Sequence, residues 1–331
     1  RGSPEVGVGV ATRFDTIFDA RYTSRIRFAG DASLGFSFPF VNGSISYKII
    51  QPDYVSLGTY YTSNNYQSLG ASLSTMLFRR ISLSGNFSMQ NDNLSKKQLY
   101  TNNGYVYSAM ASYNHTCGFG ISGMFNGYLQ RQDDGAAVVN DTTRVNRELR
   151  SVTIMPSYSH SGENFDHSVS LSANYTENID HNRFNIGMSD VQTLALGASY
   201  NLGVKPWEMD FGLSSSMQQS KGFNSKYTSV VTSLSTGRGF LKDKNLNMSA
   251  SVSLCYNHVQ YTSKSLSMAL DLNASYSLKQ AHTFSASASF SKYGDVNPTQ
   301  TRSSLDATDI RLSLNYVYTF QLLHLKKKAK K

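Results

Sequence analysis

The sequence predicts an all-β protein, a transmembrane antiparallel up-and-down β-barrel of about 16 strands, with 14 to 18 as the range. Three observations lead to this prediction. Apolar and polar residues alternate strictly over stretches of roughly ten residues, and the connections between these stretches alternate in length. The chain is also poor in charge and rich in aromatic residues, with 21 Tyr and 18 Phe among 331 residues.

The composition favours strands that have a wet face and an apolar face. Charged residues make up 16% of the chain and hydrophobic residues 40%, both below the values usual in soluble globular proteins. Ser, Asn, Thr, Gln and Gly account for the difference. No stretch approaches the ~20 consecutive apolar residues of a membrane-spanning helix, which excludes a helical membrane protein. Uncharged polar residues interleaved with aromatic ones suit a barrel with a polar lumen.

Period-two alternation marks the individual strands. Residues 81–90, ISLSGNFSMQ, place apolar or small residues on one face and polar residues on the other, because successive side chains of a strand point to opposite sides. The same pattern recurs at 246–258, 266–278, 284–292 and 310–320. Alternation of this length matches the ~9–11 residues with which a tilted strand crosses a bilayer.

The connections predict the orientation of the barrel. Short connections at 79–80, 116–117, 203–206 and 279–282 alternate with longer polar ones at 91–104, 131–148, 177–190 and 292–309. Outer-membrane barrels keep their short turns on the periplasmic side, so we expect the longer loops outside the cell. The crossings number about seventeen, and the even number usual in such barrels implies that one weak segment is not a strand or that a strand lies upstream.

The chain divides into three predicted parts. Residues 1–30 hold weak strand patterns and are expected to form strands, a linker or a plug, and residues 31–321 form the barrel. Residues 322–331 form a basic tail, placed in the periplasm by strand parity. Its lysine run contributes to a net charge of +9 and is expected to be solvated, with anionic lipid or nucleic acid as the alternative contacts. Without a leader peptide, the chain is interpreted as a mature protein or an excised C-terminal part.

Three stretches resemble the barrel regions of poorly characterised outer-membrane proteins of the Bacteroidota. They are YKIIQPDYVSLGTYY at 47–61, NFSMQNDNL at 86–94 and the final aromatic strand LNYVYTF at 314–320. The resemblance implies a barrel in a bacterial outer membrane and implies no particular substrate. The chain departs from the family by continuing beyond Phe320, whereas such barrels usually stop at the terminal aromatic residue.

No motif for catalysis or for metal or cofactor binding stands out. The histidines fall mostly at strand ends or in loops, and Ser is too abundant for its proximity to a His to indicate a nucleophile. Cys117 and Cys255 are too few for a disulfide framework or a four-ligand zinc site, and their different depths argue against a bond between them. We therefore expect no enzyme activity and no cofactor.

Charged residues on the polar faces are the candidates for lining the lumen, where charge tunes ion selectivity. They are Glu208, Asp210, Asp271 and Arg311. The alternative is that these residues only form hydrogen bonds within a packed or wet interior. Asp271 lies near the middle of its strand, where a lone carboxylate needs water or a cationic partner.

Aromatic residues near the strand ends predict interfacial girdles. On the periplasmic side they are Tyr200, Trp207, Tyr276, Phe284, Tyr318 and Phe320, and on the outer side Tyr128, Tyr261 and Tyr293. The alternative is that aromatic residues merely favour strands.

Two functions remain open at this point. A ring of about sixteen strands can hold an aqueous pore, which predicts a porin-like channel or transport pore for small solutes. The alternative is a non-transporting membrane anchor or scaffold, the barrel part of a larger complex with other outer-membrane or periplasmic proteins. A loop at 132–146 or the N-terminal 30 residues would plug the lumen if either folded inward. The expected partners include outer-membrane lipid and exclude nucleic acid, and the loop asymmetry disfavours a soluble adhesin.

Overall fold

The computed structural model describes residues 27–54, 64–185, 187–241, 245–260, 263–278, 281–295 and 307–319. This part of the chain is all-β, apart from the short 3-10 helix η2 at Lys205–Trp207. The strands are β1 (Ala29–Ser37), β2 (Val41–Ile50), β3 (Tyr66–Leu77), β4 (Ile81–Asp92), β5 (Tyr100–Asn114), β6 (Phe119–Asp134), β7 (Asn146–Ser161), β8 (Phe165–Asp180), β9 (Val191–Val204), β10 (Met209–Gly222), β11 (Ser225–Phe240), β12 (Leu246–Val259), β13 (Ser263–Leu278), β14 (His282–Asp295) and β15 (Ala307–Tyr318).

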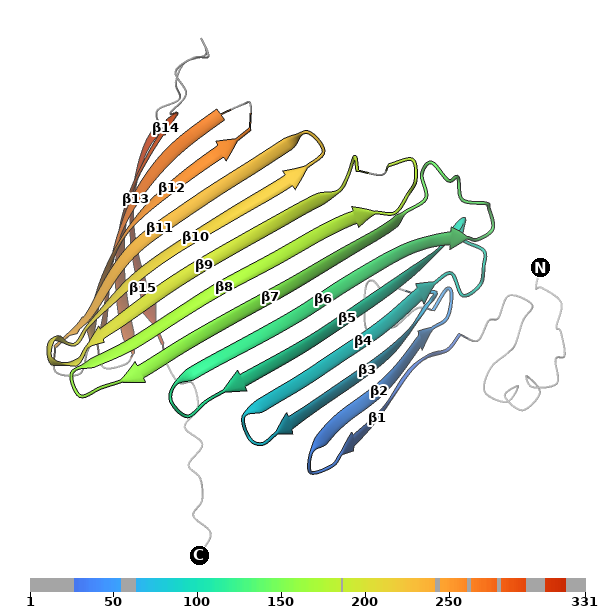
Figure 1. Cartoon of the computed structure of the whole chain (residues 1–331), viewed down its shortest axis with the longest axis horizontal. Helices are drawn as coiled ribbons and strands as arrows, with labels where there is room; N and C mark the ends of the chain where they lie inside the picture. The colour runs from blue at the N-terminus through green and yellow to red at the C-terminus, as the bar shows by residue number, and fades with distance from the viewer. Residues whose placement is uncertain are drawn as a thin grey trace, which may run out of the picture.

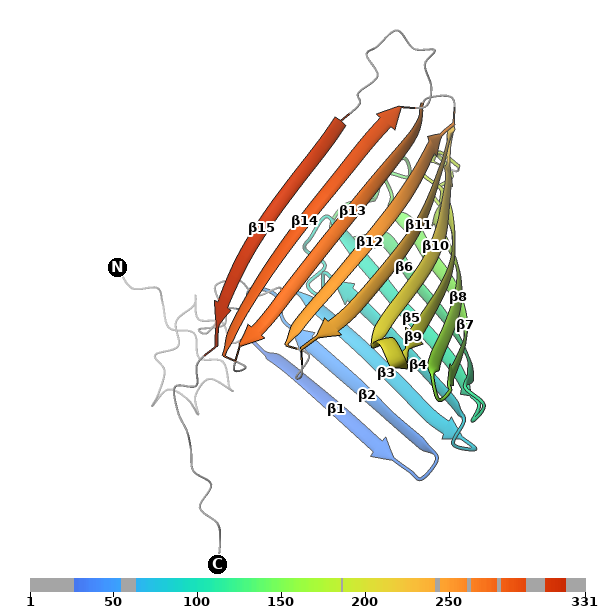
Figure 2. The same ribbon diagram turned by 90° about the vertical axis from the view of Figure 1, so that its left-hand side faces the viewer.

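All of these strands belong to one 15-stranded sheet in which every strand pairs with the next along the chain (Figure 1). Each pairing is antiparallel, so the predicted up-and-down arrangement is confirmed. The sheet curves strongly, and Figure 2 shows its two edges, β1 and β15, on the side opposite to β7 and β8. Within the described residues β1 pairs with β2 alone and β15 with β14 alone.

The register gives the sheet one apolar face and one polar face. Leu272 pairs with Ala250 on β12 and with Ala288 on β14. Directly paired residues point to the same side of a sheet, so these three apolar residues share one face. The preceding residue, Asp271, lies opposite two serines on the other face. This alternation continues across the sheet, as the period-two pattern of the sequence predicted.

The apolar face has no second layer to pack against. The buried hydrophobic residues among those described are Ile50, Val139 and Val204, whereas Leu272 is 46% and Leu312 is 79% exposed. A soluble sandwich would bury such a face against another sheet. We therefore take the apolar face as the lipid-facing outside of the barrel and the polar face as its inside.

The connections differ between the two ends of the sheet. At one end, called the turn end, they span 38–40, 78–80, 115–118, 162–164, 205–208, 241–245 and 279–281. At the other, called the loop end, they span 51–65, 93–99, 135–145, 181–190, 223–224, 260–262 and 296–306. The predicted asymmetry therefore holds, with two exceptions: at the loop end the β10–β11 and β12–β13 connections are only two and three residues long.

The turn between β3 and β4 shows how the short connections close. Phe78 and Arg79 both have positive φ, at 51° and 56°, and the Arg80 amide donates to the Leu77 carbonyl at 3.1 Å. Two central residues with positive φ define a type I′ turn, whose twist matches that of the flanking strands. Separately, no helix in the part of the chain that the structure describes is long and apolar enough to cross a membrane.

Candidate functional site

Small polar residues line the inner face of the sheet. Paired positions on neighbouring strands form a continuous row across β9 to β15, which we call the Asp271 row. It consists of Asn201, Gly212, Ser235, Ser251, Asp271, Ser289 and Arg311. Short side chains leave space on the inside of the wall, and their hydroxyl and amide groups are ready partners for water. Two opposite charges stand in this otherwise neutral row.

Asp271 and Arg311 lie on the polar face, which we take as the inner face, and the structure brings them into the same row. Neighbouring strands lie ~4.8 Å apart, so two strand spacings place the two backbones ~10 Å apart. The Arg311 Nε donates to Asp309 Oδ2 at 2.6 Å, and the Arg311 side chain remains 79% exposed. Asp271 has no ion-pair partner among the described residues. Its carboxylate is therefore available to water and to passing cations.

The turn end of the inner face holds a second group of charges. Asp210 lies opposite Gly203 on β9 and Gly237 on β11. On β8, Asp166 also lies opposite Gly203, and Lys205 Nζ is 3.0 Å from Asp166 Oδ1. Sequence reasoning placed Asp210 correctly but missed Asp166. The signal was present, because Asp166 shares its parity with the serines of β8.

The prediction that Glu208 lies on the lumen face of a strand is wrong. Glu208 follows η2, with φ at 50°, and its amide donates to the Lys205 carbonyl at 3.1 Å. The strand begins one residue later, at Met209. Pro206 explains the difference, because a proline lacks the amide donor that a ladder position requires. Trp207 belongs to the same turn and is 60% exposed.

Several of the predicted girdle residues lie on the outer face near the turn end. Tyr200, Tyr276, Phe284 and Tyr318 all have this position. Histidines accompany them: His167 Nδ1 lies 2.8 Å from the Tyr200 hydroxyl oxygen, and the rings of His282 and Tyr318 stack at 4.7 Å. This arrangement fits an interfacial belt, in which an aromatic body has a polar tip.

The predicted outer girdle is not formed as expected. Tyr128 pairs with Val106 and Leu149 on the inner face, and Tyr293 pairs with Ser267 on the same face, so neither points toward lipid. Phe320 and Tyr261 lie outside the described residues, as does the basic tail at 322–331.

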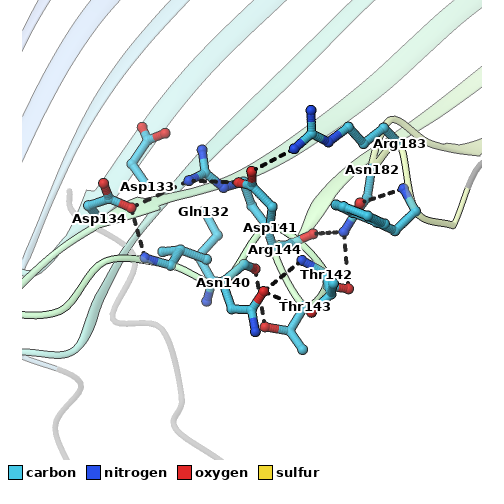
Figure 3. Close-up of polar contacts among 12 residues, drawn as sticks. Gln132, Asp133, Asp134, Asn140, Asp141, Thr142, Thr143, Arg144, Asn182 and Arg183 are labelled. Atoms are coloured by element: carbon cyan, nitrogen blue, oxygen red, sulfur yellow. Dashed lines mark hydrogen bonds and ion pairs between the residues drawn. The ribbon is translucent and has the colours of Figure 1, made fainter.

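Three neighbouring loops at the loop end contact each other and form a wall, which we call the loop wall (93–99, 135–145 and 181–190). Figure 3 shows its centre. Asp141 accepts from Arg183 at 3.0 Å and lies 3.4 Å from Arg144, which also reaches Asp134 at 3.5 Å. The Asn182 side-chain amide Nδ2 donates to the Arg144 carbonyl at 2.9 Å. These contacts join the β6–β7 loop to the β8–β9 loop.

Backbone hydrogen bonds extend the loop wall to β5. The Ala136 amide donates to the Gln98 carbonyl at 2.9 Å, and the side-chain amide of buried Asn93 donates to Gln98 and Tyr100 carbonyls at 3.2 Å. Val139 is 3% exposed within this region. The sequence placed a loop at 132–146, but β6 continues to Asp134. The contacts of the loop lie along the rim, and inward plugging remains a prediction.

The described residues do not contain a group of three or more His, Cys, Asp or Glu side chains that would hold a metal ion. Cys117 and Cys255 are both free.

No protein-family model matches the sequence, and no curated protein matches it. Among solved structures, the chain is similar to the siderophore receptor PirA from Acinetobacter baumannii, with a TM-score of 0.51 and 9% identity. This match covers 88% of the chain and 55% of the receptor chain. It is also similar to OmpT of Vibrio cholerae, with a TM-score of 0.41 and 8% identity over 86% of this chain and 99% of that one.

The likeness to PirA concerns the fold, since the identity is low. The resemblance to Bacteroidota proteins stays a prediction, because no match tests it. The outer-membrane location predicted from the sequence agrees with both the fold and the exposed apolar face. The chain has the fold of an outer-membrane β-barrel protein.

Proposed function

We propose that the protein forms a water-filled channel in a bacterial outer membrane, through which small polar solutes diffuse. The observation that carries this proposal is the Asp271 row, a stretch of small polar residues that crosses β9 to β15 on the inner face with one acidic and one basic residue. A lining of this kind offers water many uncharged hydrogen-bonding groups and few charged groups. The channel requires no catalytic step and no cofactor.

Cross-strand hydroxyl pairs support a wet lining. The Oγ atoms of Ser44 and Ser72 lie 2.7 Å apart, those of Ser82 and Ser112 2.6 Å apart, and those of Ser170 and Ser199 2.6 Å apart. Each pair satisfies one donor, and the remaining lone pairs face the lumen and accept from water. The Asp271 row is therefore polar with one charge of each sign, which favours passage over tight binding.

Single-channel conductance of the refolded chain in a planar bilayer tests the proposal. We expect stable ohmic steps from the wild type, a shift of reversal potential toward anions for Asp271→Asn and a shift toward cations for Arg311→Ala. Ser289→Ala, in the same row and uncharged, is the matched control and should leave selectivity unchanged. A heat-modifiable, bilayer-inserted chain that passes no current would overturn the channel.

A second function, a non-transporting scaffold, is favoured by a different observation. β1 and β15 are not paired with each other within the described residues, and the chain spans 55% of the length of PirA. Both facts fit a barrel wall that belongs to a larger assembly with other outer-membrane or periplasmic proteins. An inserted chain without conductance is the result that this function predicts.

A further inference from the structure

Four lysines lie on the lipid-facing side of the sheet, close to the loop end. They are Lys221 of β10, Lys226 of β11, Lys264 of β13 and Lys292 of β14, and all four are exposed. We call them the lysine collar. By strand parity Lys221 shares its face with Met217, and Lys292 shares its face with Phe290, which places the collar immediately beyond the apolar band.

Among the described residues, no acidic side chain neutralises the charge of the collar. No Asp or Glu occupies an outward position on the described strands β10 to β15. Lys221 and Lys226 are direct register partners, and like charges directly opposite each other destabilise a sheet. Lys264 lies opposite His258. None of the four lysines has an ion-pair partner within the described ranges, so an external anion would relieve this repulsion.

The outward charges on β7 and β8 are arranged differently. Arg150 Nε donates to Glu148 Oε1 at 2.7 Å and Arg150 Nη1 lies 3.7 Å from Glu177 Oε1, so this cation is paired within the protein. At the turn end of β10 to β15, the outward cation among the described strand residues is Arg238, which lies 5.0 Å over the Phe240 ring. Uncompensated positive charge is therefore concentrated at the loop end of one side of the wall.

We propose that the lysine collar binds the phosphate groups of a phosphorylated glycolipid of the outer leaflet. The inference rests on the orientation of the proposed channel, in which the loop end faces outward. Lysine is a compact point charge that suits phosphate, and its stem lies along apolar surface while the ammonium reaches the headgroup layer. The apolar band below, including Leu254 and Leu266, would contact the acyl chains.

Lipid binding to the refolded full-length chain tests the proposal. Bisphosphorylated lipid A, the same lipid without phosphates and phosphatidylglycerol are titrated in a zwitterionic detergent, with adducts counted by native mass spectrometry. We expect bisphosphorylated lipid A to bind most tightly, and the affinity to fall about fivefold for each lysine replaced by Gln at 221, 226, 264 and 292. Arg238→Gln, an outward cation at the other end, is the control and should bind as the wild type does.

Lys226→Glu separates a lipid site from a merely structural role. The new carboxylate faces Lys221, so the lipid-free protein should resist denaturant better, while the affinity for bisphosphorylated lipid A should fall. A four-lysine variant that binds this lipid like the wild type would overturn the proposal, and so would equal binding of phosphatidylglycerol. Because conductance is recorded separately, a closed barrel that still binds the lipid would refute the channel and leave the lysine collar intact.

Discussion

Asp271 and Arg311 lie in one row on the inner face of the sheet, with Ser289 of β14 directly between them. The separation of ~10 Å that two strand spacings imply is close to the Debye length at physiological ionic strength, so the two charges still influence the same volume of lumen water. A solute near this row passes a negative and a positive site in turn. Arg311 also pairs with Asp309 on the same face, so the three side chains together carry a net charge of −1 and should favour cations weakly.

This pairing predicts a compensating double variant. Asp271→Asn and Arg311→Ala should shift the reversal potential in opposite directions, and the double variant should return close to the wild-type value, because each change removes one unit of opposite charge. The measurement is the reversal potential in a salt gradient. Two shifts in the same direction would show that these residues do not face a common ion path.

The two faces of β13 predict opposite costs for one added charge. Leu272→Arg places a guanidinium toward lipid and should destabilise the barrel by ~2–4 kcal/mol if the residue lies near the bilayer midplane. Asn273→Arg, the next residue along, points into the lumen and should cost much less. Urea unfolding of the chain in lipid vesicles measures both. Similar costs for the two variants would contradict the assignment of faces.

Glu148 predicts a strong effect on stability at the loop end. Its carboxylate accepts from Tyr107 at 3.0 Å, from Arg150 at 2.7 and 2.8 Å, and lies 2.9 Å from His181 Nε2. Glu148→Gln removes the charge that these donors share and should cost ~1–3 kcal/mol in the free energy of unfolding. Tyr107→Phe removes a single hydrogen bond and serves as the milder control. An unchanged unfolding midpoint for Glu148→Gln would show that the cluster contributes nothing.

The loop wall predicts a local rather than a global response. Asp141 joins Arg144 and Arg183, and all three side chains are partly exposed. Asp141→Asn should therefore change the global stability by less than ~1 kcal/mol, while trypsin cleavage after Arg144 becomes faster. Limited proteolysis of the folded barrel measures the rate. Asp53→Asn, in the β2–β3 connection, is a control for surface charge, and equal cleavage in all three proteins would contradict the role of Asp141.

Much of the fold follows from the sequence because its main signal has a period of two. The stretch 81–90 predicted a strand with one apolar face, and β4 spans Ile81–Asp92 with that alternation. The strand ends were less predictable. β6 continues through polar residues to Asp134, since backbone pairing with β5 does not require apolar side chains. Polar residues at a barrel rim fit a strand and a loop equally well.

The residues that were misplaced show where pattern reasoning fails. In β6, Phe125 and Tyr128 stand three residues apart and so lie on opposite faces, which means that an aromatic residue near a strand end does not by itself reveal its side. Glu208 was assigned by extending the alternation of β10 backward from Asp210, whereas the strand begins only at Met209. The Asp271 row required information that no single strand contains, because the register between strands depends on the turn geometry.

The two edges of the described sheet have a consequence for how the ring is completed. Both β1 and β15 run from the loop end to the turn end. Successive strands alternate in direction, and an odd number of strands lies between these two, so they run the same way. If these edges met directly they would form a parallel ladder, with slanted hydrogen bonds, in an otherwise antiparallel wall. An inserted partner strand would have to run in the opposite direction to pair antiparallel with both. Backbone groups cannot remain unpaired in hydrocarbon. The circumference of the barrel therefore depends on whether β1 and β15 pair with each other or with an inserted strand.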